Sequence, residues 1–312
     1  MRTLLSTLLI LLGVNLVAQA TWTNHINDHI IEDIALEGDF FWTATQGGLV
    51  KMNIETNEKE FIRAANSGYR GGSPKEIEIA EDGTKWIGGQ NSGLFRWDGE
   101  NSWENFYFIN TGDTLIEIDK LKLDPNGNPW FLSVSNGTCW GCPKLISYDG
   151  SEFSNHQANL QLPIDRGVKD FAFIDENELW VAAYNDIIRY DGNEMLMTYS
   201  PTAIGLVQDE SIRRIEVDNQ GVLWVSTENY TTGYDRLIKF DGNQWLIEDG
   251  NAPGYVTSFF KDINGELWAN FFGGATESNS YGTYNGTAWQ YYTTNILDIP
   301  IWYGTPVLYA VD

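Results

Sequence analysis

Residues 215–227 read IEVDNQGVLWVST. The segment alternates apolar and polar residues, passes through Asp218-x-x-Gly221, and resumes at Trp224 with a second apolar stretch. Such alternation is typical of a half-buried β-strand, and Asp and Gly are residues that tight turns favour. The segment therefore predicts two antiparallel strands joined by a short turn, with Trp224 opening the second strand.

The same pattern recurs along the chain, for example at residues 77–89, which read IEIAEDGTKWIGG. Downstream of most copies, a hydrophobic strand ends on an aromatic residue followed by Asp-Gly, and a large side chain follows within four residues. Each unit thus holds four short strands, which we name a to d, and Asp-Gly joins c to d. The tryptophan that opens strand b recurs at spacings of 44, 44, 50, 44 and 44 residues, as Trp42, Trp86, Trp130, Trp180, Trp224 and Trp268.

A four-stranded unit of about 40–45 residues is the signature of a β-propeller blade. We therefore predict an all-β fold, a β-propeller with six complete blades of four strands. Most tryptophans fall at strand b or at the start of strand d, so we expect them to pack between blades and to have a structural role.

The two chain ends resemble the missing parts of a further blade. Residues 22–25 resemble a strand d, and residues 306–312 align with strand a at residues 212–218. Because isolated sheet edges are a liability, we expect a partial seventh blade formed by both chain ends, with the chain truncated inside it. The alternative is a closed six-bladed ring on which two terminal strands pack.

The N-terminal segment, residues 1–20, reads MRTLLSTLLILLGVNLVAQA. Arg2 precedes an apolar run, and small residues stand at both cleavage positions before residue 21, which predicts a secretory signal peptide cleaved after Ala20. Residues 21–312 would then form the propeller. We find no later stretch apolar enough to span a membrane, so we expect a secreted or periplasmic protein.

The composition limits the partners of this protein. The 312 residues include 43 Asp and Glu against 19 Lys and Arg, a net charge of −24. Such a surface repels phosphate backbones, so we expect no binding to nucleic acid. Hydrophobic residues make up 42% of the chain, enough for a buried core.

The loops of a four-stranded blade divide between two faces. Alternation places the a–b and c–d turns on one face, and the b–c loops with the d–a connections on the other. The b–c loops are longer in blades three, five and six, and varied loops on a rigid scaffold are typical of a recognition surface. We expect this face to bind a carbohydrate or a protein, and its candidate contact residues are Trp140, Tyr230, Tyr234, Phe271 and Phe272.

The two cysteines, Cys139 and Cys142, lie in the b–c loop of blade three. A redox Cys-x-x-Cys pair needs a helix N-terminus to lower one thiol pKa, and no helix is predicted there. In an oxidising compartment we expect a small structural disulfide instead. With two cysteines and no nearby histidine, the sequence predicts no zinc site, and we expect no metal or cofactor.

The repeat resembles that of the two-component regulator propeller family. The resemblance is strongest at Asp218–Thr227 with Phe240–Trp245, and is recognisable at Asp82–Gly89 with Trp97–Trp103. It implies an extracytoplasmic β-propeller like the sensing domains of bacterial hybrid sensor kinases, or like secreted proteins with a C-terminal sorting domain.

These features predict a non-catalytic propeller that binds a ligand or a protein. One alternative is a propeller-type lyase or glycosidase acting on extracellular polysaccharide, which a cluster of acidic residues with raised pKa values at the channel would favour. Another is a secreted surface or matrix protein, which an exposed apolar patch would favour.

Overall fold

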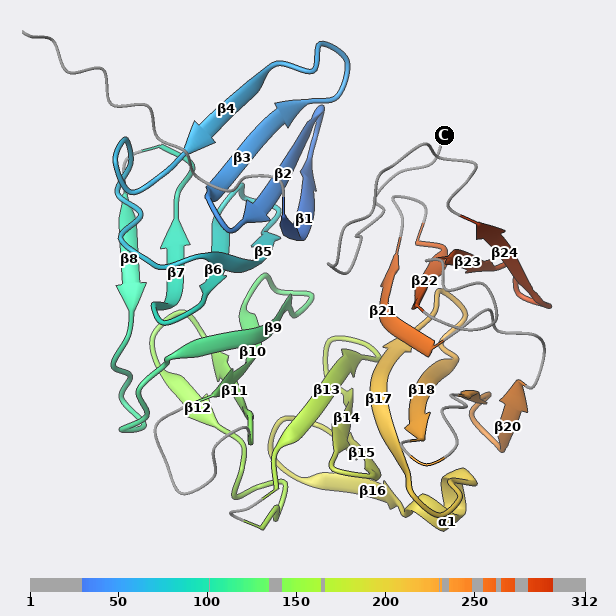
Figure 1. Cartoon of the computed structure of the whole chain (residues 1–312). Helices are drawn as coiled ribbons and strands as arrows, with labels where there is room; N and C mark the ends of the chain where they lie inside the picture. Colours follow the sequence, from blue (N-terminus) through green and yellow to red (C-terminus); the bar gives the residue numbers. More distant parts are fainter. Residues whose placement is uncertain are drawn as a thin grey trace, which may run out of the picture.

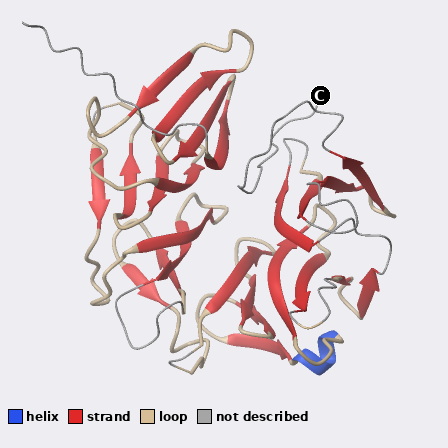
Figure 2. Cartoon of the chain, viewed as in Figure 1, coloured by secondary structure: helices blue, strands red, loops and turns tan. Residues whose placement is uncertain are grey.

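The computed structural model describes residues 30–100, 102–134, 142–163, 166–229, 231, 236–248, 255–261, 265–272 and 280–293. In this part of the chain, six four-stranded antiparallel sheets are arranged around a common centre (Figure 1). Apart from the single helical turn α1 (Pro201–Ile204), the described residues form only strands, turns and loops (Figure 2). The six complete blades predicted from the repeat are therefore confirmed.

Every sheet keeps its strands in sequence order, with the first strand innermost and the fourth at the rim. The blades are, in order, β1 (Ile31–Glu37), β2 (Phe40–Thr45), β3 (Gly48–Asn53) and β4 (Lys59–Ile62); β5 (Pro74–Ile79), β6 (Lys85–Gly89), β7 (Gly93–Trp97) and β8 (Trp103–Phe106); β9 (Glu117–Leu123), β10 (Pro129–Val134), β11 (Lys144–Tyr148) and β12 (Phe153–Asn155); β13 (Val168–Phe173), β14 (Leu179–Ala183), β15 (Asp186–Tyr190) and β16 (Met195–Tyr199); β17 (Glu210–Val217), β18 (Leu223–Asn229), β19 (Leu237–Phe240) and β20 (Trp245–Glu248); β21 (Tyr255–Lys261), β22 (Leu267–Phe272), β23 (Ser280–Tyr284) and β24 (Trp289–Thr293).

The six repeated tryptophans all lie in the second strand of their blades, as predicted. Most of them pack against the aromatic residue of the third strand in the following blade. The ring centroids of Trp42 and Trp97 are 5.5 Å apart, and those of Trp224 and Tyr284 are 4.5 Å apart. The same pairing joins Trp86 to Tyr148 and Trp180 to Phe240. These indoles therefore hold neighbouring blades together, as the sequence indicated.

At the junction of blades three and four, His156 lies between Trp130 and Tyr190, the aromatic residue of the third strand of blade four. The His156 ring stacks on Trp130 at 4.6 Å and meets Tyr190 of the next blade at 5.6 Å. Its Nδ1 lies 2.9 Å from the Tyr190 hydroxyl and its Nε2 lies 2.9 Å from Ser147 Oγ. Burial lowers the pKa of His156 to about 4, so the ring is neutral at physiological pH.

The a–b turn explains why the repeat couples an aspartate to the tryptophan. In blade five, Asp218 Oδ1 accepts hydrogen bonds from the backbone amides of Gln220 and Val222, which closes the turn. Its Oδ2 accepts a 3.0 Å bond from the indole nitrogen of Trp224. Gly221 has a φ of 79°, in the left-handed region that glycine favours.

The chain ends are not among the described residues. The predicted signal peptide at residues 1–20 and the segments proposed for a seventh blade, residues 22–25 and 306–312, all lie outside them, so both remain predictions. Among the described helices, none is long and apolar enough to cross a membrane.

Candidate functional site

All six innermost strands carry a β-bulge at the same place. The pairing register of each with its neighbour skips one residue near the start of the strand. A bulge turns two successive side chains toward one side of the sheet. The resulting pairs are Glu32 and Asp33, Lys75 and Glu76, Asp119 and Lys120, Lys169 and Asp170, Arg213 and Arg214, and Thr257 and Ser258.

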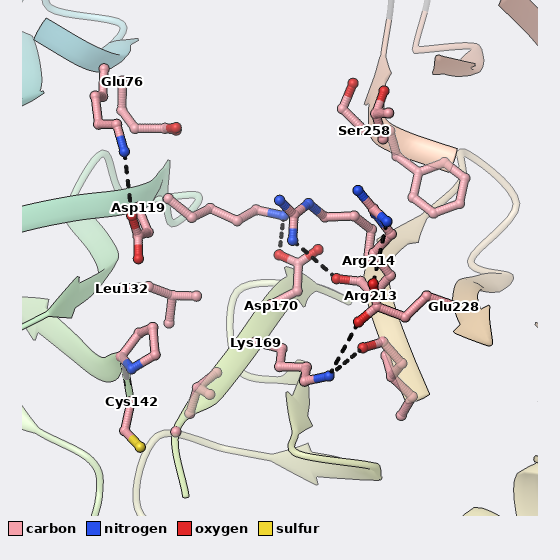
Figure 3. Close-up of a pocket in the computed structure, with 18 of the residues that line it drawn as sticks. Glu76, Asp119, Leu132, Cys142, Lys169, Asp170, Arg213, Arg214, Glu228 and Ser258 are labelled. Carbon is pink, nitrogen blue, oxygen red and sulfur yellow. Dashed lines mark hydrogen bonds and ion pairs between the residues drawn. The ribbon is translucent and has the colours of Figure 1, made fainter. Parts of the chain in front are cut away.

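These six pairs line a cavity of about 810 Å³ at the centre of the ring, which we call the vestibule. Its lining also includes Tyr184 from the β14–β15 turn, and Arg166 and Gly167 from the connection before β13. The vestibule therefore opens on the face of the b–c loops and d–a connections, which is the face expected to bind. Figure 3 shows Asp119 on one side of this space and Arg213, Arg214 and Glu228 on the other.

The vestibule differs in charge from the rest of the protein. Six of the chain's 19 basic residues line it, but only six of its 43 acidic residues do. The acidic members lie mostly on blades one to three, whereas four basic residues come from blades four and five: Arg166, Lys169, Arg213 and Arg214. The lining strand of blade six is uncharged there and supplies Thr257, Ser258, Phe259 and Phe260.

Carboxylates of the bulge pairs join neighbouring innermost strands. Asp33 Oδ2 accepts a 2.8 Å hydrogen bond from the Ile77 amide, and Asp170 Oδ2 accepts one of 2.8 Å from the Ile215 amide. Glu76 Oε2 likewise accepts a 3.2 Å hydrogen bond from the Leu121 amide of the next innermost strand. We call these contacts blade latches, because each links the edge of one blade to the next through an N–H that its own sheet does not use.

Ion pairs join the innermost strands of blades three, four and five in the channel. Lys120 pairs with Asp170, and Lys122 of blade three pairs with Glu216 of blade five. A second cavity of about 580 Å³ adjoins the vestibule, and its lining includes Glu78, Lys122 and Glu216. The two cavities share Asp33, Glu76 and Lys120 in their linings, so they are neighbouring parts of one channel.

Three carboxyl groups in the channel, those of Glu76, Glu78 and Asp119, have raised pKa values, and burial is the largest cause for each. Burial, together with the nearby charge of Asp33, raises the pKa of Glu78 to about 8. The same two causes raise the pKa of Glu76 well above its ordinary value. This is the kind of acidic cluster that the sequence analysis associated with an enzyme.

The candidate contact residues have different outcomes. Trp140, Tyr230 and Tyr234 lie outside the described residues, and Phe272 is the last residue of β22. Phe271 was expected in a loop, but it lies within β22, is 1% exposed, and packs on Trp289 and Tyr291. The expectation was therefore wrong for Phe271. The b–c loop of blade six was predicted to begin at residue 271, but strand β22 continues to Phe272.

The cysteine loop borders the vestibule. Cys142 is disulfide-bonded and, with Pro143, lines the cavity. Cys139 lies outside the described residues, so its pairing with Cys142 stays a prediction. The Pro143 carbonyl accepts a 2.8 Å hydrogen bond from the Val168 amide, which attaches this end of the loop to the first strand of blade four.

Comparison with known proteins agrees with this architecture. The family model described as "Two component regulator propeller" matches residues 206–229. The chain carries a two component regulator propeller repeat. The regulator propeller repeat covers β17 and β18, and so contains Trp224 together with Arg213, Arg214 and Glu228 of the vestibule. No curated protein sequence matches the chain.

Solved structures share the fold at low sequence identity. The extracellular domain of BT3049 from B. thetaiotaomicron, described as a hybrid two component system, is 16% identical over 82% of this chain, with a TM-score of 0.57. Catalytically inactive virginiamycin B lyase from Staphylococcus aureus is 14% identical, with a TM-score of 0.61 and 87% coverage of both chains. This chain spans between 34% and 40% of the length of the BT3049 structure and of two BT4673 structures from the same species.

The bulge pairs are the feature of the candidate site that the sequence analysis did not predict. Their signal is a doublet of polar residues directly after an apolar residue in every strand a, such as Lys-Asp after Val168 and Arg-Arg after Ile212. In a regular strand, one member of each doublet would point into the packed face between blades. The doublets therefore interrupt the alternation of apolar and polar residues from which strands are predicted.

The latch at Asp170 predicts a large loss of stability on truncation. Asp170 is fully buried, and Asp170→Ala would leave both the Lys120 ammonium and the Ile215 amide without this acceptor. We expect a loss of about 3–5 kcal/mol in the free energy of unfolding, measured by urea denaturation. The matched control, Glu178→Ala, breaks the more exposed pair with Arg189 and should cost about 1 kcal/mol or less. Equal losses for the two variants would contradict the latch.

The raised pKa of Glu78 predicts a stability that falls with rising pH. Because this pKa rises from 4.5 to about 8 on folding, the native state binds more protons than the unfolded chain between these values. Glu78→Gln should therefore match the parent protein near pH 5 and have a higher melting temperature near pH 8.5, by roughly 2–4 °C per kcal/mol relieved. The exposed control Glu81→Gln should show no such pH-dependent gain, and identical profiles for the two variants would refute the assignment.

Proposed function

We propose that this protein is an extracytoplasmic, non-catalytic binding propeller whose ligand enters the vestibule from the face of the b–c loops. The observation that carries the proposal is the set of six bulges, which directs two side chains from every blade into one cavity. The likeness to the sensing domains of two-component systems, through the regulator propeller repeat, supports a role in ligand recognition.

The vestibule has the properties of a preformed small-molecule site. Its volume of about 810 Å³ lies within the range typical of ligand pockets. Many of its charged side chains are already oriented by latches and ion pairs, so binding would cost little side-chain entropy. Polar groups beside Phe259 and Tyr184 offer both hydrogen bonds and apolar contacts, which suit a carbohydrate or a short peptide.

A bulky substitution in the vestibule tests the proposal. The full chain would be screened against arrays of glycans and of short peptides, and each hit measured by calorimetry. Thr257→Trp should fill part of the cavity on its uncharged side and weaken binding by about tenfold or more, since each tenfold loss is only 1.4 kcal/mol. Thr198→Trp, on the exposed outer strand β16, is the matched control and should bind as the parent does. Unchanged binding by a folded Thr257→Trp variant would place the ligand elsewhere.

The raised pKa values of Glu76 and Glu78 favour a second candidate, a lyase or hydrolase acting on extracellular polysaccharide. A carboxyl group that keeps its proton near neutral pH can act as a general acid beside an ionised neighbour such as Glu216. Binding stands first because Glu76 is engaged in a blade latch and Glu78 lines the second cavity, not the vestibule.

The enzyme candidate makes a distinct prediction. Any polymer cleavage by the purified protein should be lost in Glu78→Gln, by about 100-fold or more, as is typical when a general acid is removed. Product release would be followed by a reducing-end assay, with Glu81→Gln as the control. Cleavage that survives Glu78→Gln would exclude this group as the acid.

A further inference from the structure

Arg214 departs from the pattern of its position in the fold. The equivalent residue is a carboxylate in blades one, two and four, where it accepts the hydrogen bond of a blade latch. A guanidinium has no acceptor atom, so Arg214 cannot hold the next blade in this way. The cationic Lys120 of blade three instead pairs with Asp170. At the positions equivalent to Arg214, the charged residues of the other blades all bind a group of a neighbouring blade.

The described residues leave Arg214 with few partners. Its side chain is exposed to the vestibule, and Nη1 donates a 3.0 Å hydrogen bond to the Arg213 carbonyl. Within the described part of the chain it makes no ion pair, in contrast to Lys120, Lys169 and Arg213. A guanidinium offers five N–H donors, so most of those of Arg214 face the cavity without a protein acceptor from these residues.

Positive charge accumulates around Arg214. Lys169 and Arg213 both approach the same carboxylate, that of Glu228, at 3.8 Å and 3.3 Å. Burial and then the positive charges of Arg214 and Arg213 lower the pKa of Lys169, although Glu228 opposes this. Asp119, across the vestibule, interacts electrostatically with Arg214 but is itself paired with Lys75, and Asp170 is bound by Lys120 and the Ile215 amide. Arg214 therefore lies beside two cations that already share one carboxylate, in a protein whose net charge is −24.

We propose that Arg214, flanked by Lys169 and Arg213, binds an oxyanion of the vestibule ligand, either a carboxylate or a sulfate group. Guanidinium groups bind both oxyanions through charge-assisted, often bidentate hydrogen bonds. The uncharged wall of blade six, with Thr257, Ser258 and Phe259, follows blade five in the ring and would face the rest of the ligand. This inference rests on the proposed function, because it assigns a chemistry to the same site.

Direct titration of the two anions tests the subsite. The 15N-labelled full chain would be titrated with sodium acetate and, separately, with sodium sulfate, at an ionic strength held constant with sodium chloride. The side-chain Nε–H resonance of Arg214 and the amide resonances of Thr257 and Ser258 would report binding. We expect saturable shifts with at least one anion, and the anion that binds more tightly identifies the group that the ligand carries.

Substitution separates a specific subsite from general charge attraction. Arg214→Gln should weaken anion binding by about tenfold or more, as loss of a charge-assisted hydrogen bond implies. The matched control Arg96→Gln removes the same charge from a half-exposed pair with Glu104 outside the vestibule and should leave the affinity unchanged. Equal affinity in the two variants, or shifts that never saturate in the parent protein, would overturn the proposal.

The outcome is distinguishable from a failure of the proposed function. If a ligand from the screen is lost in Thr257→Trp but retained at full affinity in Arg214→Gln, the vestibule is the binding site and the oxyanion subsite is wrong. If Arg214→Gln weakens the anions while Thr257→Trp retains every ligand found in the screen, the subsite exists and the proposed function is wrong.

Discussion

The inner edge of each blade is the constraint on which this structure depends. The first strand of every sheet pairs on one side only, so a row of backbone amides and carbonyls faces the centre of the ring. Carboxylates from the preceding blade accept some of these amides, at Ile77, Leu121 and Ile215. Backbone amides that would otherwise be unpaired at the sheet edge therefore bind the preceding blade. The repeated indoles form a second set of contacts between blades, further from the centre.

This arrangement brings charge into the centre of the molecule, and its balance requires cations. Lys120 and Lys122 form ion pairs with Asp170 and Glu216 in the channel. Glu76 and Glu78 are less well compensated, and their raised pKa values reflect burial beside Asp33. The basic residues of blades four and five exceed what the scaffold needs at this point, and this excess gives the vestibule its affinity for an oxyanion in our proposal.

Several expectations were tested by particular residues. The six tryptophans were correctly predicted to lie in the second strand of each blade, because they recur at nearly constant spacing. Each contact is made with an adjacent blade, so it recurs with the repeat. Phe271 was misplaced because the length of a strand cannot be separated from that of the loop after it when both are apolar. His156 at the Trp130 junction was not foreseen, since a single histidine after strand d carries no periodic signal.

The amino-acid sequence alone determined the six complete blades and the order of their strands. These features depend on short-range pairing, on Asp-Gly turns and on a repeat that recurs within 44 to 50 residues. Only the tertiary structure decided which side chains meet in the channel. Lys122 and Glu216 come from blades three and five, and the arrangement of the blades brings them together. Arg214 and Asp170 hold equivalent positions, but only Asp170 has an acceptor atom for a blade latch. Contacts across a ring join residues with no fixed separation in the chain, so no local pattern can encode them.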